Sequence, residues 1–407
     1  MKYIDGGVTA AKGFEAAATA AGIKYKDRTD MAMIYSAEPC VAAGTFTTNV
    51  CKAAPVIWDK QICDSGAAVH AVVVNSGIAN ACTGQEGLDI CQGTADAAAE
   101  ALSIPADSVV LGSTGVIGKQ IPLDKIAAGV KVLAGEKCSC IEAGSKAAAA
   151  IMTTDTCPKE LAVTIEVDGV TVTIGGMAKG SGMIHPNMCT MLAFITTDAV
   201  ITKEALQSAL SDDVNDTYNM ISVDGDTSTN DTVLVLANGQ AGNPVIECGT
   251  PAYEEFKKAL HEINEYLAKK IAGDGEGATA LFTVIAKGCE SVEQAKLLAK
   301  SIACSNLVKT AIAGHDANWG RILCAMGYSG AQFDPVKVDL SFESAAGQIQ
   351  ICENGTAVDY SEDKATEILS ESEITATVDV HMGDCQATAW GCDLTHAYIE
   401  INADYRS

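Results

Sequence analysis

The chain lacks a surplus of basic residues: its 407 residues include 27 Lys plus Arg against 52 Asp plus Glu, a formal charge of −25. Nucleic acids and anionic membrane surfaces attract proteins through such a surplus, so neither is expected as a partner. Pro is scarce, with 9 residues, and hydrophobic residues make up 48% of the chain. This composition excludes a low-complexity or intrinsically disordered protein.

Long apolar runs are missing as well. No stretch of about 18 uncharged apolar residues occurs, so we expect no transmembrane helix, and the first residues lack the apolar core of a signal peptide. The 16 Cys include no Cys-x-x-Cys pair, and Cys138 and Cys140 are the two closest. Scattered cysteines of this kind are typical of a cytoplasmic protein whose thiols are reduced, buried and inert.

Several cofactor motifs are present only in incomplete form. In GGMAKGSG (175–182), Ser181 stands where a P-loop requires Lys, and GDGEG (273–277) lies between a helix and a strand in the reverse of the dinucleotide-binding order. Both are interpreted as glycines at turns. DGDTSTND (224–231) lacks the Gly and the Glu that a calcium loop requires, and is interpreted as a polar turn. The six His show no paired ligand spacing. We therefore expect neither a metal nor a nucleotide cofactor.

Strand-like and helix-like segments alternate along most of the chain. Short apolar runs predict strands that begin near His70, Ser108, Thr190 and Ala278. Two alternating runs joined at Asp168-Gly169 predict a β-hairpin. Amphipathic patterns predict helices over 87–103, 123–134, 203–210 and 253–272.

The pattern restarts at Ser291 with a predicted helix that runs to Cys304, followed by a helix-like WGRILCAM and several strands from Val336 to the end. We therefore expect an α+β fold with a layered sheet-and-helix core and a smaller C-terminal α+β domain over 289–407.

One segment combines flexible residues with a buried strand: KGSGMIHPNMCTMLAFITTDA, residues 179–199. Thr190 opens the strand. If the bond before it is cut, the freed α-amine, with a pKa of about 7.7–8.0, is well placed to act as a general base for the Thr190 hydroxyl. No Gly-x-Ser-x-Gly elbow competes with this interpretation.

Motifs along the whole chain resemble those of the ornithine acetyltransferase family, the self-processing glutamate N-acetyltransferases of arginine biosynthesis. The segments that carry the resemblance are TTNVCKAAPV, VVNSGIANACTG, STGVIG, TTDTCPK, KGSGMIHPNMCTMLAFITTDA, SVDGDTSTND, GDGEGATA, GHDANWGRI and INADYRS. The resemblance implies an N-terminal-nucleophile fold. It also implies autocatalytic cleavage between Cys189 and Thr190, which leaves an α chain (1–189) and a β chain whose first part (190–288) completes the catalytic core.

The resemblance further implies the roles of individual residues. Thr190 takes the acetyl group of N-acetylornithine and passes it to glutamate in a ping-pong mechanism, with Thr114 and Gly115 as the oxyanion hole. The implied substrate contacts are Thr153, Lys179, Thr190, Glu276, Asn402 and Ser407, the last two in a C-terminal tail that returns to the active site. Lys179 suits an α-carboxylate and Glu276 suits the ammonium of ornithine. Cys189 and Ser407 depart from the common Ala and Thr.

Several alternatives stay open at this point. Acetyl-CoA as a second donor, the role of His185 and feedback inhibition by arginine are not decided by the sequence. The family is built from two α and two β chains, or multiples of them, which implies a heterotetramer. A self-processed aminopeptidase or amidase, with water as the acceptor, is the second hypothesis, and an unprocessed binding protein is the third.

Overall fold

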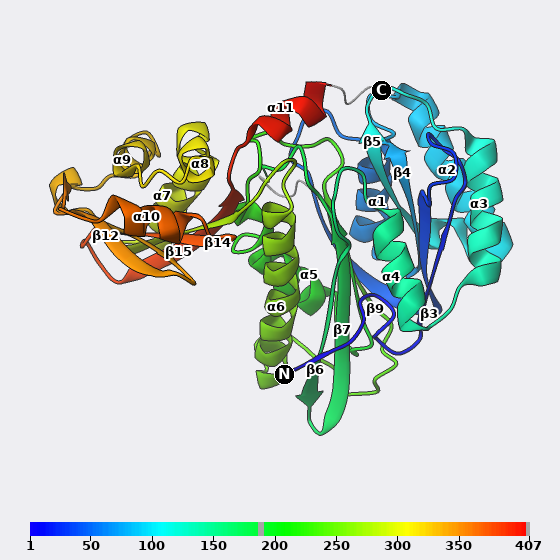
Figure 1. Cartoon of the computed structure of the whole chain (residues 1–407). Coiled ribbons are helices and arrows are strands. Elements are labelled where there is room, and N and C mark those ends of the chain that lie inside the picture. The colour runs from blue at the N-terminus through cyan, green and yellow to red at the C-terminus, as the bar shows by residue number, and fades with distance from the viewer. Residues whose placement is uncertain (186–190, 404–407) are drawn as a thin grey trace. The chain divides into compact units, whose positions relative to one another are not determined.

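The computed structural model describes residues 1–185 and 191–403 (Figure 1). Cys189, Thr190 and Ser407 therefore lie outside the described residues. The described chain forms two compact units, the first from residues 1–180, 191–218 and 227–267, the second from 181–185, 219–226 and 268–403. The segment boundaries expected from the sequence, 1–189, 190–288 and 289–407, follow the expected cut and stay predictions.

The first unit is built on one large mixed sheet. Its strands run in the order β1 (Lys2–Ile4), β6 (Lys159–Val167), β7 (Val170–Lys179), β8 (Leu192–Thr197), β9 (Thr232–Ala237), β3 (Met31–Phe46), β4 (Val69–Ile78) and β5 (Val109–Val116), and β2 (Phe14–Thr19) pairs with β3. The long β3 joins the two halves, because its first part pairs with β4 and its second part with β9. The predicted hairpin is confirmed as β6–β7, with positive φ at Asp168 and Gly169, as a two-residue turn requires.

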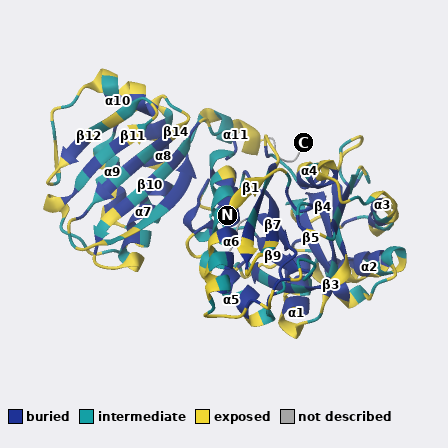
Figure 2. Cartoon of the chain, turned by 90° about the horizontal axis from the view of Figure 1, so that it is seen from below, coloured by how far each residue is buried: buried dark blue, intermediate teal, exposed yellow. Residues whose placement is uncertain are grey.

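Helices cover this sheet, and side chains that alternate along a strand belong to different buried clusters. The helices are α1 (Ala54–Ser65), α2 (Gly84–Leu102), α3 (Leu123–Glu136), α4 (Ile141–Ala150), α5 (Lys203–Asp213) and α6 (Pro251–Gly273), whose last residues belong to the second unit. On β4, Val72 and Val74 belong to one buried cluster with residues of α4, whereas Val73 belongs to another with residues of α2 and α3. Strand β4 is therefore buried on both faces (Figure 2).

The second unit contains a six-stranded sheet with helices packed on it. The strand order is β13 (Thr356–Ala357), β12 (Gly347–Glu353), β11 (Asp339–Ser344), β14 (Glu373–Asp379), β10 (Leu281–Cys289) and β15 (Cys385–Cys392). The helices are α7 (Val292–Cys304), α8 (Asn306–Ala313), α9 (Trp319–Gly327), α10 (Glu362–Leu369) and α11 (His396–Ala403). Helix α7 packs on β10 and β15, and α10 packs on β11 and β12. In β10, Phe282 and Val284 are buried while Thr283 and Ile285 between them are only partly buried.

The expected α+β fold class is confirmed, with two corrections of detail. The strands expected after Val336 are present, but α10 and α11 interrupt and follow them, and neither helix was expected. Short 3₁₀ turns occur at Ala106–Ser108, Tyr218–Met220 and Pro335–Lys337.

All described cysteines are free, as expected. The expectation that they are buried is wrong for six cysteines, which are exposed: Cys51, Cys82, Cys140, Cys157, Cys248 and Cys324. Among the described residues, no helix is both long and apolar enough to cross a membrane.

Candidate active site

The predicted oxyanion-hole residues lie at the end of β5, where the strand has a constrained backbone. Gly115 has φ +126°, and a Cβ at this position would lie 2.3 Å from the carbonyl carbon of Gly77 on the neighbouring β4. No side chain fits there, so the Ser-Thr-Gly sequence depends on glycine for this close approach. Thr114 and Gly115 are partly exposed, as groups that meet a substrate must be.

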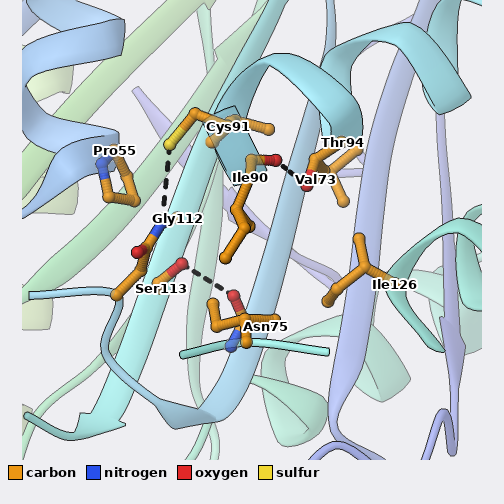
Figure 3. Close-up of a pocket in the computed structure, with 12 residues that line it drawn as sticks. Pro55, Val73, Asn75, Ile90, Cys91, Thr94, Gly112, Ser113 and Ile126 are labelled. Carbon is orange, nitrogen blue, oxygen red and sulfur yellow. Dashed lines mark hydrogen bonds between the residues drawn. The ribbon is translucent and has the colours of Figure 1, made fainter. Parts of the chain in front are cut away.

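Two buried amide side chains, those of Asn75 and Asn230, fix the backbone near the end of β5. Ser113 Oγ donates to Asn75 Oδ1 at 2.7 Å, which joins β5 to β4 beside a small buried cavity (Figure 3). The Asn230 amide donates to the carbonyl oxygens of Ala79 (2.6 Å) and Ser113 (2.8 Å). A buried amide with both N–H groups satisfied by backbone carbonyls fixes their positions, so these contacts pre-organise the residues on either side of Ser113.

A buried carboxylate lies between two lysines at the other predicted site of the first unit. Asp155 Oδ1 accepts from Lys159 Nζ at 2.8 Å and from the Gly180 N–H at 2.6 Å, and Asp155 Oδ2 accepts from the Thr153 N–H at 3.0 Å. Lys179 Nζ lies 3.8 Å from Asp155 Oδ2. Asp155 and Lys159 side chains are 0% exposed and Lys179 is 9% exposed. One carboxylate thus ties together the end of β7, the start of β6 and the loop that carries Thr153.

The electrostatics of this cluster keep Asp155 ionised. Burial by itself would raise the pKa of Asp155, but the ammonium groups of Lys179 and Lys159 and the hydrogen bonds hold it well below its usual range. Two ammonium groups therefore lie beside one ionised carboxylate. A lysine ammonium at such a site suits an anionic ligand, because charge-assisted hydrogen bonds to carboxylates are strong.

Asp231 is a second buried carboxyl near Lys179, and its state is the opposite. Burial raises the pKa of Asp231 well above its ordinary value, and the hydrogen bonds of Ser228 and Thr47 and the charge of Lys179 only partly oppose this shift. Its Oδ2 has no hydrogen-bond partner among the described residues. Burial therefore favours the uncharged form of Asp231.

In the second unit, the structure brings Glu276 and Asn402 into direct contact. The Asn402 amide donates to Glu276 Oε2 at 2.7 Å, and Glu276 is only 7% exposed. Glycines make room for this arrangement, since a Cβ on Gly182 would lie 2.4 Å from the Glu276 carboxyl carbon and one on Gly277 would lie 2.7 Å from the Tyr398 nitrogen. The C-terminal α11 is thereby held against the GDGEG segment. Glu276 thus contacts the described part of the C-terminal tail, the segment that was expected to return to the site.

The segment that precedes the predicted cut is anchored within the second unit. Asp224 accepts the backbone N–H groups of Met183 (2.6 Å) and Ile184 (2.9 Å). His185 Nδ1 lies 3.1 Å from Ser222 Oγ and 3.4 Å from Cys304 Sγ. Burial and the charge of Lys300 lower the pKa of His185 to about 4, so the imidazole is neutral near pH 7.

The structure therefore groups the expected site residues in part. Thr153 and Lys179 share Asp155, Thr114 and Gly115 are adjacent on β5, and Glu276 contacts Asn402. The interpretation of every glycine of GGMAKGSG as a turn glycine is wrong, because Gly175 and Gly176 lie inside β7. Among the described residues, no group of three or more His, Cys, Asp or Glu is arranged to hold a metal.

The sequence did not indicate the structural contacts of four further residues: Asp155, Lys159, Asp224 and Asn230. Their signal was present in TTDTCPK and SVDGDTSTND, two motifs that carried the family resemblance. The polar-turn interpretation of the second motif holds locally, since Asp224 also accepts the Asp226 N–H at 3.1 Å. It missed the contacts that Asp224 and Asn230 make with distant segments.

Comparison with known proteins gives a consistent result. The model of the ArgJ family matches residues 15–407. The arginine biosynthesis bifunctional protein ArgJ of Symbiobacterium thermophilum is 51% identical over 409 residues, with 100% of both chains covered. That of Thermotoga neapolitana is 50% identical, with 97% of this chain and 99% of the relative covered. The crystal structure of the arginine biosynthesis bifunctional protein argJ from Bacillus halodurans matches with a TM-score of 0.51 and 46% identity, over 53% of this chain and 99% of that one. The chain belongs to the ArgJ family.

Proposed function

We propose that this protein is a glutamate N-acetyltransferase that moves the acetyl group from N-acetylornithine to glutamate in arginine biosynthesis. The observation that carries the proposal is the match to ArgJ proteins over the whole chain, at about half identity. The ammonium groups beside Asp155 support an amino-acid substrate, because the α-carboxylate is common to both substrates.

The chemistry follows from a threonine with a free α-amine. Cleavage of the Cys189–Thr190 bond supplies that amine, which takes the proton of the Thr190 hydroxyl as its oxygen attacks the acetyl carbonyl. The C–N bond of N-acetylornithine then breaks, ornithine leaves with the proton, and an acetyl-threonine ester remains. The amine of glutamate attacks this ester, which releases N-acetylglutamate and restores the hydroxyl.

The negative charge that develops on the acetyl oxygen needs donors. We assign them to the Thr114 hydroxyl and the Gly115 N–H, which the Asn75–Ser113–Asn230 contacts hold in place. Pre-organised donors of this kind are worth on the order of a hundred- to a thousandfold in rate each. Lys179 is assigned to the α-carboxylate and Glu276 to the ornithine ammonium, with Thr153, Asn402 and Ser407 as further contacts.

The length of a solved relative supports processing. A cut before Thr190 leaves 407 − 189 = 218 residues in the β chain, about 54% of the sequence. The B. halodurans chain corresponds to 53% of this chain along 99% of its own length. A chain of that size matches one product of such a cut.

Incubation with N-acetylornithine and glutamate tests the proposal. Formation of N-acetylglutamate that disappears in the Thr190→Ala variant is expected. Release of acetate without N-acetylglutamate would support the aminopeptidase or amidase hypothesis instead.

Three further assignments accompany this function. The word bifunctional in the names of the relatives supports acetyl-CoA as a second donor, which is tested by adding acetyl-CoA and glutamate alone. No other cofactor is proposed. A heterotetramer of two α and two β chains follows from the family resemblance, and sedimentation of the purified protein tests it. A cytoplasmic location is proposed from the scattered cysteines of the sequence.

A further inference from the structure

The proposed reaction brings two amino acids with opposite side-chain charges to one nucleophile. Ornithine ends in an ammonium group, to which Glu276 is assigned, whereas the side chain of glutamate ends in a carboxylate. A second carboxylate repels that end of glutamate, because like charges brought together at a binding site are unfavourable. Selection of glutamate as the acceptor therefore calls for a cationic group other than Lys179, which is assigned to the α-carboxylate.

A cationic loop lies between β2 and β3 of the first unit. Its segment KYKDR (24–28) carries three cationic residues against one acidic residue, in a chain whose formal charge is −25. The buried Asp30 closes the loop, since its Oδ1 accepts the Ala21 N–H at 2.7 Å and its Oδ2 accepts the Ile23 N–H at 2.6 Å. These bonds fix the backbone that carries the cationic side chains.

This loop contacts the backbone behind the predicted oxyanion hole. The Ser76 N–H donates to the Asp30 carbonyl oxygen at 2.9 Å, which joins the loop to β4. A Cβ on Gly77, the next residue of β4, would lie 3.0 Å from the Lys24 Cβ. Gly77 is also the residue that the Gly115 position approaches most closely. Lys24 therefore packs beside the backbone that supports the oxyanion turn.

Arg28 connects the same loop to a predicted substrate contact. Its Nη2 donates to the carbonyl oxygens of Met152 at 2.8 Å and of Thr153 at 3.0 Å. The Thr153 N–H in turn donates to Asp155 Oδ2, which lies 3.8 Å from Lys179 Nζ. Arg28 is only partly buried. A guanidinium is a planar fork of several N–H donors, so bonds made through Nη2 still permit a carboxylate to meet Nη1 and Nε.

We propose that Arg28 is a specificity-determining residue that binds the side-chain carboxylate of glutamate, with Lys24 adding positive charge beside it. The proposal rests on the proposed function for its acceptor. Lys24 Nζ and the guanidinium carbon of Arg28 lie 4.6 Å and 5.5 Å from the centroid of the same Tyr25 ring. The two cations thus form one small positive surface, which Arg28 joins to Thr153. A carboxylate binds such a surface through charge-assisted, bidentate hydrogen bonds to the guanidinium.

The test separates the two halves of the reaction. N-acetylornithine first acetylates the enzyme, and glutamate or glutamine then removes the acetyl group, which intact mass spectrometry of quenched samples follows. The readout is the ratio of the deacetylation rate constant for glutamate to that for glutamine, which does not depend on the fraction of folded protein. We expect Arg28→Gln to lower this ratio roughly ten- to a hundredfold, the range of one charge-assisted hydrogen bond.

Two further variants control for charge and for support of the loop. Lys26→Met removes an exposed cation of the same segment and should leave the ratio unchanged. Arg28→Lys keeps the positive charge and should retain a higher ratio than Arg28→Gln. Equal losses for glutamate and glutamine in Arg28→Gln would assign Arg28 to support of the Thr153 loop and overturn the proposal. A fall of the ratio in Lys26→Met as large as that in Arg28→Gln would overturn it as well.

Failure of the proposed function is distinguishable, because the wild-type protein would then form no acetyl-enzyme. In that event, calorimetry measures the binding of glutamate and of glutamine to the wild-type protein and to Arg28→Gln. A preference of the wild-type protein for glutamate that Arg28→Gln loses would support the carboxylate site. Equal binding of the two by the wild-type protein, binding of neither, or a preference that the variant retains would overturn it.

Discussion

The two units of the molecule use the same ion pair in different surroundings. In the first, Lys159 and Asp155 lie 2.8 Å apart with both side chains 0% exposed. In the second, Lys287 and Asp379 lie 3.4 Å apart on neighbouring strands, with side chains 46% and 21% exposed. Exposed pairs contribute about 0–1 kcal/mol, whereas loss of one partner of a buried pair leaves a charge without compensation. The buried pair is therefore the one whose disruption should cost the most stability.

Removal of the two aspartates tests this difference most strongly. Asp155→Ala should lower the free energy of unfolding by about 3–5 kcal/mol, because it leaves two buried ammonium groups without their carboxylate. Asp379→Ala should cost at most about 1 kcal/mol. Urea denaturation of both variants measures the two values, and equal losses would contradict the comparison.

The Gly115→Ala substitution should abolish most activity by distorting the oxyanion turn. Its Cβ would meet the Gly77 backbone at 2.3 Å, at a φ of +126°. We expect kcat to fall on the order of a hundred- to a thousandfold, the effect of losing one oxyanion donor. Gly118→Ala is the matched control, since Gly118 also has positive φ, +79°, but nothing lies within 4 Å of its Cβ position. A similar loss of activity in both variants would assign the effect to general strain.

The Asn230→Ala substitution separates support of the site from support of the fold. It leaves the carbonyls of Ala79 and Ser113 unpaired and should cost about 1–3 kcal/mol of stability. Because Ser113 precedes the oxyanion residues, kcat should also fall, by about tenfold. Asn238→Ala removes a comparably buried amide that bonds Lys12 and Ser36 on the same unit. It should match the stability loss and retain kcat, and an equal fall of kcat in both would refute a specific role for Asn230.

A smaller effect is expected at His261 of α6, which pairs with Asp213 of α5 and Glu265 of α6. Hydrogen bonds to Asp213 and Glu265 raise the pKa of His261 to about 10. A raised histidine pKa stabilises the fold fully below its unfolded value of about 6.5, and this contribution is lost as the pH rises through the folded value. His261 is 41% exposed, so His261→Gln should cost only about 0.3–1 kcal/mol near pH 6. Urea midpoints of the two proteins should converge above about pH 10; a constant difference would contradict the assigned pKa.

Much of the fold follows from local pattern, and the helix over 253–272 and the hairpin at Asp168-Gly169 are examples. Periodicity and turn residues act within a few positions, so they can be interpreted without the tertiary structure. Helix α11 could not be predicted in this way, because the residues that it packs against, Glu276 and Gly277 of the GDGEG segment, are distant in the sequence.

The site was predictable only as far as the family resemblance named its residues. Thr153, Lys179 and Glu276 came from motifs, but the role of Asp155 depends on the register of β6 and β7 and on the fold of the loop after α4. Spacing of four residues between Asp155 and Lys159 does not indicate a pair outside a helix. Asn230 likewise contacts Ala79 and Ser113 across more than a hundred positions.

Intact mass spectrometry of the purified protein, before and after addition of N-acetylornithine, tests the central claim most directly. We expect two chains, residues 1–189 and 190–407, in place of one chain of 42.0 kDa. The chain that begins with Thr190 should gain one acetyl group with N-acetylornithine and lose it when glutamate is added. A single intact chain, or a processed chain that never carries the acetyl group, would contradict the account.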